Sequence, residues 1–224
     1  MQAILFLHGF TSEEKENEAL LKTLKENSKN RVFAPFLPGH GPNPRIRLHY
    51  QDWLDRADQE MREILRQYSD VVVIGHSMGG ILASYLADRY SEVSHLILVA
   101  PAFYFGNPSW KRKKESTKKA PFYVGILKKW RAYPKHYFLE FRRIRKFARK
   151  KKWKITCPTL LLHGTEDHVV PPKASQFIQQ RIRGTTYKTA ILECGHRVFE
   201  SKKQQIVISY IESFWSKFQY QDKI

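Results

Sequence analysis

The sequence of 224 residues lacks the features that mark secreted or membrane-spanning chains. Its two cysteines, Cys157 and Cys194, are too few for a disulfide framework, and they favour a reducing compartment. No apolar run reaches the roughly 18 residues that a transmembrane helix requires. Residues 3–7 are apolar, but no basic segment precedes them and no cleavage site follows, so we expect a core strand rather than a secretory signal. These absences predict a cytoplasmic protein.

Internal repeats and glycine- or serine-rich linkers are also missing, and the length suits a single domain. The histidines are scattered, and no cysteine pair has the spacing of zinc ligands. The sequence therefore predicts neither a metal site nor a cofactor. Cys194 is expected to be a small buried residue rather than a second nucleophile.

Acidic residues are scarce in one segment, residues 101–154. This segment holds 19 of the 39 Lys and Arg residues but only two acids, Glu115 and Glu140, so it carries +17 of the net charge of +18. It is also aromatic, because 13 of its 54 residues are Phe, Tyr or Trp. Four residues within it recur at helical spacing: Tyr137, Phe141, Ile144 and Ala148. We expect two or more helices here, inserted between two strands.

The rest of the chain alternates between apolar runs and amphipathic stretches. The runs, typical of buried strands, are 3–7, 31–34, 71–75, 95–100, 159–163 and 187–192. The stretches of helical period are 13–28, 50–68, 78–90, 172–183 and 200–218. This alternation predicts an α/β fold, in which residues 1–100 and 155–224 build a six-stranded, mainly parallel sheet with helices on both faces.

The sequence around Ser77 matches a nucleophile motif. Residues 75–79 read Gly-His-Ser-Met-Gly, which is G-x-S-x-G between a predicted strand and a predicted helix. A tight strand-to-helix turn exposes such a serine above the sheet edge, and the glycines avoid collisions in the turn. We therefore predict Ser77 as the nucleophile.

A serine nucleophile requires a base and an acid, which follow it in the order Ser, Asp or Glu, His on this scaffold. The run 160–163 leads into Glu166 and Asp167, and the run before residue 193 leads into His196. Glu166, Asp167 and His196 therefore lie at the predicted carboxyl edge of the sheet. His196 is the predicted base, and Asp167 is preferred to Glu166 as the acid because the shorter side chain is the usual partner.

Two backbone amides are expected to bind the oxyanion of the reaction intermediate. One belongs to the residue after the nucleophile, Met78, and the other to the loop after the first core strand. That loop begins His8-Gly9-Phe10, so Phe10 is the predicted second donor. The Phe10 ring would also form a wall of the acyl pocket.

Five motifs occur in one order along the chain: His8-Gly9-Phe10, Leu37-Pro38-Gly39-His40-Gly41, Gly75-His76-Ser77-Met78-Gly79-Gly80, Gly164-Thr165-Glu166-Asp167-His168-Val169-Val170-Pro171 and Gly195-His196. With them, the chain resembles the α/β-hydrolase superfamily outside residues 101–154, and especially small bacterial carboxylesterases and monoacylglycerol-lipase-like enzymes.

The resemblance implies that Asp167 is the acid of the triad, that the Phe10 and Met78 amides form the oxyanion hole, and that residues 101–154 form a cap over the site. The family's sheet has up to eight strands, whereas this chain starts at the third. We therefore expect six parallel strands.

These observations predict a serine hydrolase that cleaves small carboxylic esters through an acyl-enzyme on Ser77. Phe10, His76, Met78 and His168 are the residues expected to contact the substrate. The motifs do not fix the substrate, so a thioesterase, a hydrolase of an anionic acyl substrate, and a lipid-binding protein without turnover stay open.

The positive charge of residues 101–154 allows several interpretations. A basic, aromatic helix suits an anionic membrane surface, which would make the protein peripheral at the membrane. The charge could instead steer an anionic substrate, or only keep the protein soluble. Nucleic acid is the least favoured partner, because charge runs alone are weak evidence for it.

Overall fold

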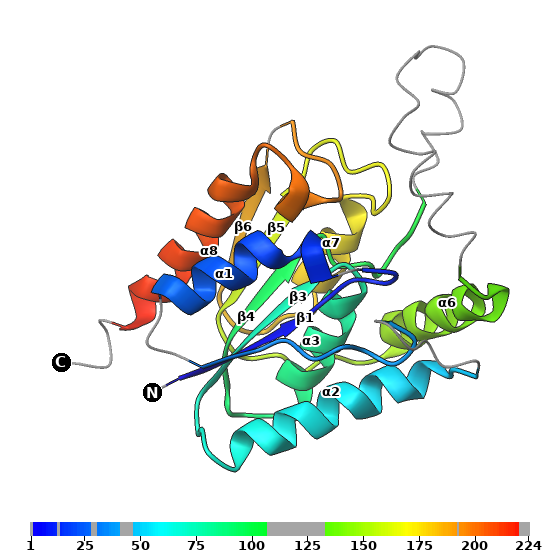
Figure 1. The fold of residues 1–224 in the computed structure, drawn as a ribbon, viewed down its shortest axis with the longest axis horizontal. Coiled ribbons are helices and arrows are strands. Elements are labelled where there is room, and N and C mark those ends of the chain that lie inside the picture. Colours follow the sequence, from blue (N-terminus) through cyan, green and yellow to red (C-terminus); the bar gives the residue numbers. More distant parts are fainter. Residues whose placement is uncertain are drawn as a thin grey trace.

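A six-stranded parallel sheet forms the centre of the protein (Figure 1). The computed structural model describes residues 2–12, 14–27, 31–40, 47–106, 133–191 and 193–219. The strands are β1 (Ala3–Leu7), β2 (Arg31–Phe33), β3 (Val71–His76), β4 (Val93–Val99), β5 (Thr159–Gly164) and β6 (Thr186–Ile191). Their order is β2-β1-β3-β4-β5-β6, and each neighbouring pair is parallel. The predicted α/β class and six-stranded sheet are confirmed.

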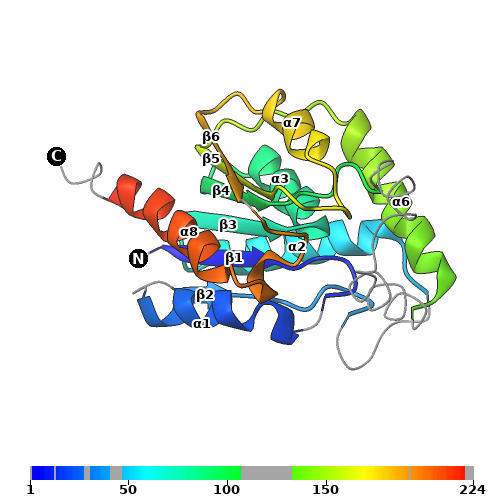
Figure 2. The ribbon, with the colours of Figure 1, turned by 90° about the horizontal axis from the view of Figure 1, so that it is seen from above.

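Helices cover both faces of this sheet (Figure 2). One face carries α1 (Glu18–Asn27) and α8 (Gln204–Gln219), with short 3-10 turns η1 (Glu14–Glu16) and η3 (Val198–Glu200) beside them. The other carries α2 (Tyr50–Leu65), α3 (Met78–Arg89), α6 (Lys135–Lys150) and α7 (Lys173–Gln179). In the described part of the chain, no helix is both long and apolar enough to cross a membrane.

The central strands are buried on both faces because their alternating side chains serve two cores. In β3, Val71 and Val73 pack against α2 and α3, whereas Val72 and Ile74 face α1 and α8. The expectation of full burial is wrong for the edge strands. In β6, Tyr187, Lys188 and Ala190 are exposed, because an edge strand is covered less completely than a central one.

Several predicted helix boundaries differ from the structure. The stretch 13–28 divides at Asn17 into η1 and α1, and residues 13 and 28 lie outside the described part. The stretches 50–68 and 172–183 end earlier than predicted, and in the stretch 200–218 the helix α8 begins only at Gln204, after η3 ends at Glu200. Helix α6 matches the predicted helical face within the insert. The further helices expected between 107 and 132 fall on residues outside the described part.

Candidate active site

Ser77 occupies the sharp turn between β3 and α3, as its motif predicts. Its φ of 55° and ψ of −115° lie where non-glycine residues are strained. Three backbone hydrogen bonds hold this conformation. The Ser77 amide donates to the Val99 carbonyl at 2.9 Å, and the Ser77 carbonyl accepts from the amides of Gly80 at 3.0 Å and Ala102 at 2.9 Å. The surrounding backbone therefore fixes where the Ser77 hydroxyl lies.

Gly79→Ala is expected to destabilise this turn strongly. A methyl group on residue 79 would overlap the carbonyl oxygens of Leu7 and His8, which belong to β1 and its following loop. Because backbone must move to relieve that overlap, we expect the free energy of unfolding to fall by about 3 kcal/mol. Gly106→Ala is the matched control, since Gly106 has a φ of +79° but no atom within 4 Å of the new methyl group. Its cost should stay near ~1 kcal/mol in urea unfolding, and equal losses in the two variants would contradict the close approach at Gly79.

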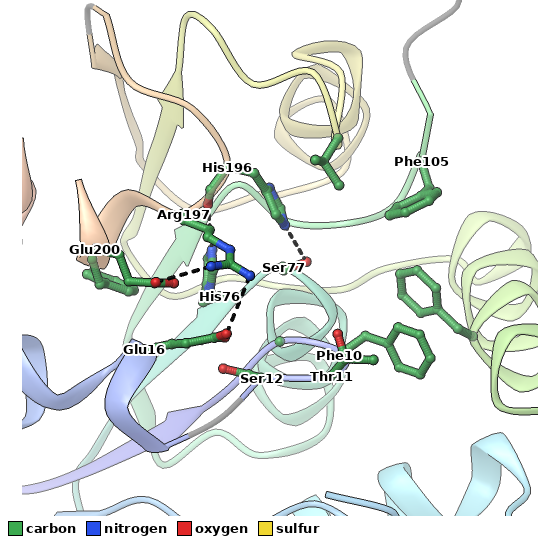
Figure 3. Close-up of a pocket in the computed structure, with 14 residues that line it drawn as sticks. Phe10, Thr11, Ser12, Glu16, His76, Ser77, Phe105, His196, Arg197 and Glu200 are labelled. Carbon is green, nitrogen blue, oxygen red and sulfur yellow. Dashed lines mark hydrogen bonds and ion pairs between the residues drawn. The ribbon is translucent and has the colours of Figure 1, made fainter. Parts of the chain in front are cut away.

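The side chains of Ser77, His196 and Asp167 are joined by two successive hydrogen bonds. Figure 3 shows the bond between Ser77 and His196. Each follows a different strand at the carboxyl edge of the sheet: β3, β6 and β5 respectively. The Ser77 hydroxyl lies 3.0 Å from His196 Nε2, and His196 Nδ1 lies 2.8 Å from Asp167 Oδ2. Because a carboxylate only accepts, Nδ1 carries the proton and donates it to Asp167. The bare Nε2 then accepts from Ser77.

Asp167 is buried, and its carboxylate is fully engaged. Its Oδ1 atom accepts hydrogen bonds from the amides of Val169 at 2.9 Å and Val170 at 2.8 Å. Burial alone would raise the pKa of Asp167, but the neighbouring His196 and the backbone hydrogen bonds outweigh it and lower the pKa. Glu166, the rival acid, is exposed, and its amide only ties the loop to the Cys194 carbonyl at 2.9 Å. The geometry therefore favours Asp167 as the partner of His196.

The loop after β1 lies directly against Ser77. A methyl group on Gly9 would meet Ser77 Cβ at 3.2 Å, so glycine permits the close approach. The amides of Thr11 and Ser12 are engaged, with His40 and the Gly9 carbonyl respectively. Among the described residues, the amides of Phe10 and Met78 have no such acceptor. The two amides predicted as oxyanion donors therefore have no backbone acceptor in the described part of the chain.

Two buried histidines join this loop to the loop at 37–40. His8 Nε2 accepts from the Leu37 amide at 3.1 Å, and His40 Nε2 accepts from the Thr11 amide at 2.8 Å. Both Nδ1 atoms face carbonyl oxygens, those of Gly9 and Pro38, at 2.9 and 3.2 Å. Each ring therefore carries its proton on Nδ1 and is neutral. The reciprocal pair holds in place the loop that carries the Phe10 amide.

Two more histidines support the hydrogen-bonded chain. His76 Nε2 donates to the His196 carbonyl at 3.1 Å, which leaves the buried His76 Nδ1 without a partner in the described structure. His163 Nε2 lies 2.9 Å from the Val170 carbonyl and 3.5 Å from Asp167 Oδ2, and burial lowers the pKa of His163. Neither side chain touches Ser77 Oγ in a hydrogen bond. They position the loops that present His196 and Asp167.

The burial of His76 predicts a pH-dependent stability. Burial, and then the nearby His196, lower the pKa of His76 from 6.5 to about 3 in the folded protein. As the pH falls below 6.5, the unfolded chain takes up a proton at His76 that the folded protein refuses, so the free energy of unfolding decreases down to about pH 3. His76→Gln retains a donor for the His196 carbonyl but does not titrate. Its free energy of unfolding should therefore fall less steeply with decreasing pH, by about 1.4 kcal/mol per pH unit at about pH 4–5.

Urea unfolding of the wild type and His76→Gln between about pH 7.5 and 4 measures this difference. Parallel pH profiles for the two proteins would contradict a histidine that stays neutral inside the fold.

A pocket of about 60 Å³ opens beside Ser77. Its apolar wall includes Phe10 from the loop after β1, Phe105, and Phe141 from α6, and the Phe10 and Phe141 rings stack with centroids 4.7 Å apart. Its polar wall includes Arg197, which pairs with Glu16 at 3.7 Å and Glu200 at 3.2 Å (Figure 3). The pocket can therefore hold an apolar group next to the Ser77 hydroxyl.

The predicted site residues take different positions relative to the pocket. Ser77, His196, Phe10 and His76 line the pocket, and Asp167 lies behind His196. The Met78 side chain is buried in the core, and neither it nor the half-buried His168 is among the described lining residues.

Several residues of the site were not assigned from the sequence, among them His8, His40, Phe105, Phe141 and Arg197. Of these, Phe141 could have been suspected from the sequence, because its helical spacing predicted that its side chain faces inward. Within the described residues, no group of three or more His, Cys, Asp or Glu side chains could hold a metal ion.

Comparisons with known proteins show which proteins this chain resembles. A thermostable monoacylglycerol lipase of Bacillus sp. (strain H-257) is 26% identical over 208 residues, which are 87% of this chain and 82% of that protein. A proline iminopeptidase of Pestalotiopsis fici is 24% identical over 84% of this chain and 82% of its own length. The crystal structure of a monoacylglycerol lipase from Paleococcus ferrophilus matches with a TM-score of 0.74 at 19% identity, covering 95% of this chain and 93% of that one. The structural match shows a shared fold.

The sequence profile of the Alpha/beta hydrolase family matches residues 4–207, nearly the whole chain. This range contains every motif described above. The chain therefore belongs to the Alpha/beta hydrolase family.

Proposed function

We propose that the protein is a serine hydrolase of carboxylic esters, with Ser77 as nucleophile, His196 as base and Asp167 as the supporting acid. One observation carries the proposal: the Ser77 hydroxyl is hydrogen-bonded to an imidazole that a buried carboxylate orients, at the edge of an apolar pocket. A hydroxyl without such a base is a weak nucleophile.

The proposed reaction begins when Ser77 Oγ attacks the ester carbonyl carbon and passes its proton to His196 Nε2. The oxyanion that forms accepts hydrogen bonds from the Phe10 and Met78 amides, while Asp167 stabilises the imidazolium. His196 then protonates the leaving alkoxide, and the alcohol departs. Water, deprotonated by His196, attacks the acyl group on Ser77, and the carboxylic acid leaves as the proton returns to Ser77 Oγ.

Phe10, Phe105 and Phe141 would bind the acyl or alcohol part of the substrate. Since Phe141 comes from α6, we propose that the insert serves as a cap over the site. The names of the relatives cover ester and peptide substrates, and the apolar wall favours an uncharged ester among them.

A substrate panel tests the proposal. We expect hydrolysis of p-nitrophenyl acetate and faster hydrolysis of the butyrate, because each buried methylene contributes about 0.8 kcal/mol. Proline p-nitroanilide and an acyl-thioester serve as comparisons. Cleavage of either comparison substrate without cleavage of the oxygen esters would overturn the ester assignment and move the peptidase or thioesterase alternative ahead.

A further inference from the structure

Helix α6 divides its cations between two faces. On the inner face, Arg145 lies 4.8 Å from the centroid of the Phe141 ring, and Arg149 donates to the Phe103 carbonyl at 2.8 Å. Arg143 pairs with the buried Glu140. These three cations have partners within the protein, so folding accounts for them.

The outer face carries cations that folding does not account for. We call the following exposed residues the basic stripe: Lys135, Arg142, Lys146 and Lys150. Their spacing of seven, four and four residues places them along one side of the helix. Within the described residues, none of the four has an acidic partner. Like charges one turn apart destabilise a helix, so the stripe is a feature that the fold itself does not require.

The acids near the stripe are already engaged. Glu140 accepts from Arg143 and from the Tyr50 amide at 3.0 Å, and Asp88 pairs with Lys151 at 2.7 Å. Burial, together with the adjacent Arg149 and Arg142, lowers the pKa of Arg145 to about 10, which still leaves it charged at neutral pH. Among the described residues, no acid therefore neutralises the basic stripe, which complements an anionic surface.

Apolar groups interrupt this positive surface. Leu139 lies within the stripe and is 55% exposed, the largest exposed fraction among the described large hydrophobic residues. The rings of Tyr50 and Phe147 line an open groove together with Arg143, Lys146, Lys150 and Lys151. Cations mixed with an exposed leucine and aromatic rings are typical of helices that bind at the interface of a lipid bilayer. The phosphates of a nucleic acid would pair with the cations but would not bind the apolar Leu139.

We propose that the outer face of α6 docks on an anionic lipid bilayer, with the basic stripe at the headgroups and Leu139 below them. Docking there would bring the bilayer near the pocket, because the opposite side of α6 supplies Phe141 to it and packs Phe138 against Phe10 with ring centroids 5.2 Å apart. The advantage of that placement for a lipid ester rests on the proposed function, but docking itself does not depend on turnover.

Co-sedimentation with vesicles tests the docking surface. The wild type should bind vesicles of phosphatidylcholine with about 30% phosphatidylglycerol, and binding to pure phosphatidylcholine should be at least about tenfold weaker. Arg142→Gln/Lys146→Gln/Lys150→Gln should bind the anionic vesicles about 100-fold more weakly, since each cation near such a surface contributes about one factor of five. Leu139→Ala should weaken the binding about fivefold.

The matched control removes three exposed lysines elsewhere, Lys25→Gln/Lys188→Gln/Lys202→Gln, and should bind like the wild type. If the two triple variants weaken binding equally, only the net charge matters and the proposed surface is wrong. Two results together would make nucleic acid, rather than a bilayer, the partner of this surface. The wild type would bind a duplex DNA of about 20 base pairs at least as tightly as the anionic vesicles, and Leu139→Ala would bind the vesicles like the wild type.

Hydrolysis of p-nitrophenyl butyrate by the stripe variant separates this proposal from the proposed function. The stripe variant should hydrolyse that soluble ester like the wild type, which also shows that it folds. Vesicle binding without any esterase activity would retain the docking surface and reject the ester hydrolase. Full esterase activity with unchanged vesicle binding in the stripe variant would reject the docking surface alone.

Discussion

Ser77→Ala is expected to lower kcat for p-nitrophenyl butyrate by about 10⁴- to 10⁶-fold, with little change in KM. The variant loses the oxygen that attacks the carbonyl carbon, whereas the aromatic wall and the Phe10 and Met78 amides persist. The residual rate comes from those amides and from substrate binding. Steady-state kinetics of the purified variant measure the loss.

Two controls accompany Ser77→Ala. Ser209→Ala removes the hydroxyl of an exposed serine on α8 and should leave kcat unchanged. Ser77→Gly should be as inactive as Ser77→Ala but more stable than it by about 1 kcal/mol, because glycine adopts the φ of 55° without strain. A Ser77→Ala protein that retains more than a tenth of the wild-type kcat would contradict the assignment of the nucleophile.

Asp167→Asn should lower kcat by about 10⁴-fold, the second largest effect expected. The side-chain amide that this substitution introduces can donate to His196 Nδ1, which would place the imidazole proton on Nε2, facing Ser77. His196 could then no longer accept the serine proton. The variant also loses the charge that stabilises the imidazolium. KM should change little, because Asp167 is buried behind His196 and is not among the described residues of the pocket wall.

Glu166→Gln tests the rival acid at the neighbouring position. Glu166 is exposed, and only its amide ties the loop, so we expect kcat within about twofold of the wild type. Parallel kinetics of the two variants, with thermal unfolding to verify that both fold, decide between them. A larger loss in Glu166→Gln than in Asp167→Asn would reverse the assignment.

The sheet and the meeting of Ser77, His196 and Asp167 could be predicted, because both depend on where the apolar strands lie in the sequence. β3 is buried throughout because both its faces are covered, and Ser77 follows it directly. His196 and Asp167 follow β6 and β5, and in a parallel sheet the carboxyl ends of all strands meet at one edge. Residues 119 positions apart, such as Ser77 and His196, therefore come within hydrogen-bonding distance.

The hydrogen bonds and ion pairs that support the site could not be predicted from the strand pattern. The bonds from Thr11 to His40 and from Leu37 to His8 depend on how two irregular loops fold against each other. The hydrophobic periodicity of the sequence does not indicate how these two loops pack. Arg197 follows the predicted base, but its partner Glu16 comes from the opposite end of the chain. The helical period of the insert predicted an inward face for Phe141, but not that this face reaches the pocket.

The proposed acyl-enzyme mechanism is tested most directly by trapping the nucleophile. An alkyl fluorophosphonate should add a single phosphonyl group to the wild-type protein, detected by intact mass spectrometry and mapped by peptide sequencing to Ser77. The same reagent should leave Ser77→Ala unmodified and should react far more slowly with His196→Ala, which lacks the base. A wild-type protein that remains unmodified, or that carries the phosphonyl group on a residue other than Ser77, would contradict the account.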